Sequence, residues 1–216
     1  DNNGVPLAPG DNEYKKLGDI NPDVYGGLSN SFSYKNFSAS FLVDFSLGGE
    51  FYSHGKLYRQ LMGTAPETLV GREEWYATHE GAGHLNNISG VIPKGYVEEG
   101  INAETGLVNE VPVQPMLRYL NVIWFNRTLS DFIIDASNIR LRELVIGYTV
   151  PEKLLENTFI SRVNFSLVGR NLFFLYNAAG FVDPESGYSS CSFGNAFELN
   201  PMPSTRSYGF NLTVNF

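Results

Sequence analysis

Cysteine, charged side chains and long apolar runs are all scarce in this sequence. Cys191 is the single cysteine among 216 residues, so no disulfide can form within the chain. Charged residues make up 18% of the chain, whereas soluble domains average about 25%. No apolar run approaches the ~18 residues that a transmembrane helix needs. Transmembrane strands stay possible, because they need only ~9–11 residues of alternating character.

Basic residues are also few. The formal net charge is −8, and the longest basic run is Lys15-Lys16. A nucleic-acid partner requires clusters of Lys and Arg that neutralise phosphates. The charge pattern therefore excludes this class of partner.

Apolar and small polar side chains alternate with a period of two in several segments. In 205–216, Tyr208, Phe210 and Leu212 share one face, while Gly209 and Asn211 share the other. The same alternation occurs in 37–48, more weakly in 24–35, and in 162–175, where it blurs near 169–171. This period predicts strands with one apolar face and one face of Ser, Asn, Thr and Gly. A soluble sheet would display more long charged side chains on its wet face.

A fifth strand is expected over 139–150, with one irregularity. Ile139 and Leu141 share a face, but Leu144 and Ile146 have the opposite parity. One extra residue near Glu143 restores a continuous apolar face, which predicts a β-bulge.

The connections between these strands alternate between short and long. The short ones lie at 35–36 and 151–161, and the long ones, 49–137 and 176–204, hold most of the acidic residues. Transmembrane barrels have short periplasmic turns and long extracellular loops. Short helices are expected within the first loop at 56–62 and 66–78, with Thr64 as N-cap candidate of the second. The sequence predicts an all-β fold: an antiparallel transmembrane β-barrel segment with large extracellular loops that contain short helices.

Several segments resemble the C-terminal part of the SusC/RagA family of TonB-dependent importers. They are "ASNIRLRELVIGYTVPEKLL" (136–155), "ISRVNFSLVGRNLFFL" (160–175), "AGFVDPE" (179–185), "PMPSTRSYGFNLTVNF" (201–216), the hairpin of 14–52 and "GREEWY" (71–76). Their order and spacing agree with the family, and the final Phe216 resembles the outer-membrane assembly signal.

The resemblance implies that residues 1–216 are the last five strands of a barrel of about 22 strands in the bacterial outer membrane. It further implies a plug domain, energy input through TonB, a SusD-like surface lipoprotein as lid, and a glycan or peptide as cargo. It implies transport, with neither catalysis nor a cofactor. A chain of 216 residues is too short to hold the plug and the other strands. We therefore expect them in another chain or fragment, or in a precursor cleaved within an extracellular loop.

Aromatic side chains of the expected loops are candidate ligand contacts, since sugars and peptides bind in aromatic-lined concave sites. The candidates are Trp75, Tyr76, Trp124, Tyr176 and Tyr188, together with Asp183 of the acidic turn. The same aromatic residues also suit packing of loops against one another or contact with a lid protein.

Two acidic or histidine-bearing motifs suggest metals. Asp183, Glu185 and Glu198 are possible oxygen ligands for Ca²⁺, but an acidic extracellular turn is the favoured interpretation. The stretch HEGAGH (79–84) differs from a zinc-protease helix, because its histidines are five apart and two glycines interrupt it. No metal is predicted.

Two other functions fit parts of the sequence. A soluble carbohydrate-binding β-sandwich would also alternate, but it predicts two closed sheets and charged wet faces. A surface hydrolase with a β-fold would use the HEGAGH stretch. Detergent dependence separates the importer from the sandwich, and metal analysis tests the hydrolase.

Overall fold

The computed structural model describes residues 1–8, 10, 15–70, 72–73, 96–113, 129–186 and 196–216. They form two compact units. The first comprises Asp1–Leu17 and Ser53–Ile133, and the second comprises Gly18–Tyr52 and Ile134–Phe216.

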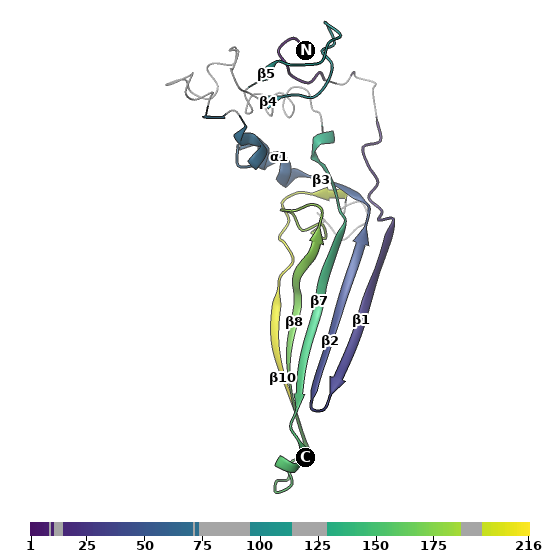
Figure 1. Cartoon of the computed structure of the whole chain (residues 1–216), viewed down its shortest axis with the longest axis vertical. Coiled ribbons are helices and arrows are strands. Elements are labelled where there is room, and N and C mark those ends of the chain that lie inside the picture. The colour runs from purple at the N-terminus through teal and green to yellow at the C-terminus, as the bar shows by residue number, and fades with distance from the viewer. Residues whose placement is uncertain (9, 11–14, 71, 74–95, 114–128, 187–195) are drawn as a thin grey trace. The chain divides into compact units, whose positions relative to one another are not determined.

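The second unit is built on a five-stranded antiparallel sheet of long strands (Figure 1). Its strands are β1 (Val24–Tyr34), β2 (Phe37–Leu47), β7 (Asn138–Thr149), β8 (Arg162–Asn177) and β10 (Ser207–Asn215), in the order β1-β2-β7-β8-β10. All five strands predicted from the alternation are confirmed.

The strand register gathers the apolar residues on one face of this sheet. Phe37 lies opposite Tyr148, which lies opposite Phe165, and Phe165 lies opposite Leu212. We call this the apolar face; it carries Leu28, Phe32, Phe37, Phe41, Val43, Leu144, Ile146, Tyr148, Phe165, Leu167, Phe210, Leu212 and Val214. None of these side chains is buried within the chain.

The opposite face, here the polar face, carries mostly small polar residues. Gly147 lies opposite Ser166, and Ser166 lies opposite Asn211. Ser40 of the neighbouring strand β2 lies on the same face. Leu42, Val145 and Val168 are apolar exceptions on it. The division of the two faces follows from the period-two alternation of each strand.

The predicted β-bulge is present in β7. Glu143 lies opposite Leu42 and Leu141 lies opposite Val43, so Arg142 is the extra residue. The insertion shifts parity by one and keeps both Leu141 and Leu144 on the apolar face. It also places Arg142 and Glu143 consecutively on the polar side.

The short connections lie at one end of the sheet, with the C-terminus (Figure 1). Lys35 has a φ of 53° in the two-residue turn between β1 and β2. The Thr149 N–H donates to the Asn36 carbonyl at 2.8 Å, and the Asn36 side chain donates back to the Thr149 carbonyl at 2.9 Å. The turn after β7 contains η4 (Glu152–Leu154), and Phe159 of this turn stacks on Phe216.

A small sheet occurs beyond the other end of the strands. It consists of β6 (Ile133–Asp135), β3 (Glu50–Ser53) and β9 (Phe197–Glu198), in that order. The chain turns into β3 through Gly48 and Gly49, whose φ values of 78° and 80° favour glycine. This sheet is not predictable from local patterns, because strands of two to four residues show too little alternation.

The first unit contains the short helices. Helix α1 (His54–Leu61) is N-capped by Ser53, whose hydroxyl accepts from the Lys56 N–H at 3.0 Å. It buries Leu57 and Leu61. The helix expected at 56–62 is therefore confirmed, with its start two residues earlier.

The second expected helix, over 66–78, is interrupted near its start. Residues Pro66–Leu69 form the 3₁₀ turn η1, Val70 is extended, and Arg72 and Glu73 are helical again. Ala65, not Thr64, is the residue at its N-cap, and Thr64 instead donates its hydroxyl to the Arg59 carbonyl at 3.2 Å. Positions 71 and 74–78 lie outside the described residues.

The remaining described elements of this unit are β4 (Tyr96–Val97), its partner β5 (Pro112–Val113) and the 3₁₀ turn η3 (Ser130–Phe132). Phe132 of η3 is fully buried. Within the described part of the chain, none of the helices has the length and apolar character required to cross a bilayer.

Candidate functional site

Charged side chains cluster on the polar face around the β7 bulge. Arg140 donates from Nη2 to Asp183 and from Nη1 to Glu185, each at 2.7 Å. The side chains of Arg140 and Asp183 are only 4% and 8% exposed. The Arg140 guanidinium also lies over the ring of its cross-strand neighbour Phe174, 3.9 Å from the centroid.

Arg142, the bulge residue, completes the cluster. Its Nε pairs with Asp44 of β2, its Nη2 pairs with Glu185, and its Nη1 donates to the Asn171 side chain at 3.2 Å. The two arginines thus share Glu185 and connect it to the sheet. We call Asp44, Arg140, Arg142, Asp183 and Glu185 the bulge cluster.

Asp183 joins both ends of the connection between β8 and β10. Its Oδ2 accepts from Arg140 and from the hydroxyl and N–H of Ser204, the latter at 3.2 Å. Its Oδ1 accepts from the Glu185 N–H at 3.1 Å. Burial by itself raises the pKa of the Asp183 carboxyl, but the hydrogen bonds from Ser204, Arg140 and Glu185 and the charge of Arg140 outweigh burial and hold that pKa below its ordinary value.

The start of this connection is held by the sheet as well. The Ala178 N–H donates to the Ser137 carbonyl at 2.9 Å, and the Asn177 side chain donates to the Val182 carbonyl at 2.9 Å. The turn that carries Asp183 is therefore ordered by neighbours on both sides.

The two carboxylate oxygens of Asp44 differ in their hydrogen bonding. One oxygen binds Arg142, whereas Oδ1 is buried and has no hydrogen-bond partner among the described residues. Buried carboxylate oxygens in proteins are normally satisfied. Asp44 Oδ1 can therefore accept from a donor other than the described residues.

Two of the six ligand-contact candidates predicted from the sequence lie among the described residues. Asp183 is occupied by ion pairs and hydrogen bonds, as described above. Tyr176 is half-exposed and lies opposite Ile139, on the side of the apolar face. Trp75, Tyr76, Trp124 and Tyr188 lie outside the described residues. The role of all six in ligand contact stays a prediction.

Sequence reasoning missed Arg140 and Arg142 as members of a site. Two signals pointed to them: a bulge predicted beside two arginines on a strand, and an acidic Asp-Pro-Glu motif in the following loop. The pairing joins residues 43 and 45 positions apart, so only the folded chain reveals it.

Groups with metal-binding potential are engaged otherwise. In the described ranges, no three His, Cys, Asp or Glu side chains come together as a metal site. Asp183 and Glu185 bind arginines, and Glu198 accepts from the Asn200 N–H at 2.8 Å. The HEGAGH stretch lies outside the described residues.

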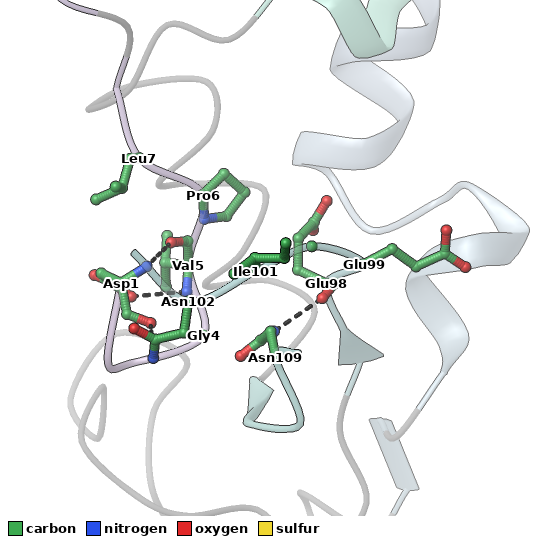
Figure 2. Close-up of a pocket in the computed structure, with 11 residues that line it drawn as sticks. Asp1, Gly4, Val5, Pro6, Leu7, Glu98, Glu99, Ile101, Asn102 and Asn109 are labelled. Carbon is green, nitrogen blue, oxygen red and sulfur yellow. Dashed lines mark hydrogen bonds between the residues drawn. The ribbon is translucent and has the colours of Figure 1, made fainter. Parts of the chain in front are cut away.

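A separate hollow of about 250 Å³ lies in the first unit (Figure 2). It is lined by 1, 4–7, 98–102 and 109. The Asn109 side chain donates to the Glu98 carbonyl at 2.9 Å, and the Asn102 side chain donates to the Asp1 carbonyl at 3.4 Å. These bonds fix the backbone around the hollow. The residues that line it include no lysine, arginine or histidine.

Comparison with known proteins finds a similar receptor sequence and similar solved structures. No protein-family model matches the sequence. TonB-dependent receptor P3 of Formosa agariphila is 25% identical over 209 residues, which cover 94% of this chain and 17% of that receptor.

Solved structures share the fold. The RagAB peptide importer in its closed-closed state aligns with a TM-score of 0.55 and 17% identity, over 91% of this chain and 18% of that chain. The open-open state aligns with a TM-score of 0.53 and 17% identity, over 97% and 20%. The chain thus spans a fifth or less of the length of these relatives. The chain is thus similar in sequence to a TonB-dependent receptor and shares its fold with solved structures of the RagAB peptide importer.

Proposed function

We propose that this chain supplies the last five strands and two large extracellular loops of an outer-membrane β-barrel of about 22 strands. The observation that carries the proposal is the apolar face, which covers all five strands and is buried on none of them. Each Leu, Ile or Phe left in water forgoes about 1.5–3 kcal/mol relative to full burial. Lipid hydrocarbon covers such a face without any further protein layer.

The sheet edges support the same proposal. β1 and β10 are the outer strands of the sheet, and each has one neighbour among the described strands. Unpaired strand edges are not tolerated in lipid, so further strands must pair with both. The plug and the remaining strands belong to the rest of the receptor, of which this chain covers a minor part.

The mechanism is transport without covalent chemistry. The short connections face the periplasm and the long ones face the cell surface, as in other transmembrane barrels. The polar face lines the lumen and meets the plug, where Asp44 Oδ1 offers an acceptor to a plug donor. Force transmitted by TonB moves the plug, and a SusD-like lipoprotein covers the loops. The cargo is a glycan or a peptide, and loop aromatics such as Trp75 and Tyr188 contact it.

Neighbouring residues on opposite faces give a matched test of the lipid contact. In the full receptor in native outer membranes, with Cys191 replaced by serine, Phe210→Cys and Asn211→Cys are compared for reaction of the introduced thiol with a water-soluble maleimide. Phe210 lies on the apolar face and Asn211 on the polar face. We expect Asn211→Cys to react and Phe210→Cys to be protected until the membrane is dissolved in a denaturing detergent.

Two outcomes of these experiments would contradict the proposal. One is equal reaction of both cysteines in intact membranes. The other is recovery of the receptor as a monodisperse soluble protein without detergent, which the β-sandwich predicts. Uptake is tested separately. Cells that lack the gene should lose TonB-dependent uptake of an oligosaccharide mixture or of a peptide mixture. The mixture whose uptake returns on complementation identifies the cargo class.

A further inference from the structure

The bulge cluster joins two parts of the chain that would otherwise be independent. Arg140 is almost fully buried, and its two hydrogen-bonded partners both come from the 181–186 turn. A buried guanidinium is tolerated only when carboxylates and further hydrogen bonds satisfy it. Undocking of this turn would leave Arg140 without its counter-ions.

The same turn is tied to the far end of its connection. A single oxygen, Asp183 Oδ2, accepts from Arg140 on β7 and from Ser204 just before β10. The start of the 178–204 connection, its end and the sheet therefore meet at one carboxylate. Glu185 adds a second attachment through both arginines.

The bulge makes this geometry possible. In a regular strand, Leu144 would fall on the opposite face from Leu141, and no register would serve both the apolar face and the arginines. With Arg142 as the extra residue, the apolar face stays continuous while two arginines reach the same turn.

From these contacts we propose that Arg140 and Arg142 are positioning residues that clamp the 178–204 connection against the polar face. The purpose of the clamp rests on the proposed function: it fixes the two described ends of this connection, 178–186 and 196–204, beside the lumen of the importer. The connection contains the candidate contact Tyr188, so the arginines act on cargo through the loop and do not bind cargo themselves.

Hydrogen exchange of the purified full receptor in detergent, read by mass spectrometry on peptides from 178–204, tests the clamp. We expect Arg140→Gln and Asp183→Asn each to speed exchange of these peptides at least about tenfold, because each removes the buried Arg140–Asp183 ion pair. The double variant should speed exchange by less than the product of the two single effects, since both changes remove that same pair.

Matched variants separate the clamp from general loosening. Arg170→Gln removes an arginine whose partner is Glu143, outside the loop, and should leave the loop peptides unchanged. Arg142→Lys should be closer to wild type than Arg142→Gln, because it keeps the cation. Ser204→Ala removes one hydroxyl and serves if the arginine variants fail to assemble; we expect faster exchange there too.

The outcome that overturns the clamp is unchanged loop exchange in Arg140→Gln or Ser204→Ala while the barrel keeps its heat-modifiable gel shift. Additive effects in the double variant also overturn it. Exchange reports loop docking whether or not the receptor transports cargo, so this result is independent of the maleimide and uptake tests of the proposed function.

Discussion

Placing an arginine on the apolar face should destabilise the assembled barrel, whereas the same arginine one residue away should not. Leu167 is 62% exposed in this chain and lies between Ile146 and Phe210, both apolar. Ser166 lies between Gly147 and Asn211 on the polar face. Leu167→Arg and Ser166→Arg therefore differ only in the face that receives the charge.

The depth of Leu167 sets the magnitude. It lies five residues after Arg162, the first residue of β8. At about 3.3 Å per residue and a tilt near 45°, that is roughly 12 Å into an apolar band about 25 Å tall. Arginine at the midplane of a transmembrane barrel costs about 2–4 kcal/mol. This is about 30- to 1000-fold in the folding equilibrium constant, at about 1.4 kcal/mol per decade.

The assay is equilibrium unfolding of the full receptor in phospholipid vesicles with guanidinium chloride, with the free energy of unfolding compared among wild type and both variants. We expect a loss of about 2–4 kcal/mol for Leu167→Arg and less than about 1 kcal/mol for Ser166→Arg. Equal losses, or a larger loss for Ser166→Arg, would refute the assignment of the two faces.

Three further predictions follow from local structure. Deleting Arg142 removes the bulge and slips the register of β7, so we expect no heat-modifiable barrel, whereas Arg142→Ala keeps the residue count and should still assemble. The pKa of Asp183 is lowered on folding, so its contribution to loop docking is present above its unfolded pKa and lost as pH falls through its folded pKa. Cleavage of 178–204 by an acid-active protease should thus rise only below the ordinary Asp pKa, and a rise near neutral pH would contradict this. Ser53→Ala removes the N-cap of α1 and should cost about 0.5–2 kcal/mol, seen as faster hydrogen exchange at Lys56; Ser53→Asp should restore protection.

The long strands were predictable because each one alternates apolar and polar residues according to its two faces. A strand with one apolar face and one polar face must alternate along its whole length, and 24–34, 37–47 and 207–215 do so. The bulge was predictable for the same reason, since one residue too many interrupts the parity between Leu141 and Leu144.

The interruption of the expected helix over 66–78 is not visible in its local pattern. Pro66 is favourable at a helix start, but Val70 adopts an extended conformation four residues later, before Arg72 and Glu73 are helical again. Side-chain preferences are weak compared with tertiary packing. The strands β3, β6 and β9 were missed because their existence depends on pairing among segments far apart in the chain.

The amino-acid order alone therefore specifies which side of each strand is apolar, since that information repeats every second residue and needs no partner. The identity of the charged partners is a different kind of information. Arg140 and Asp183 are separated by 43 positions and meet only because β7, β8 and the following turn are folded together. A buried ion pair depends on distance and burial in three dimensions, and neither quantity is encoded in a local pattern.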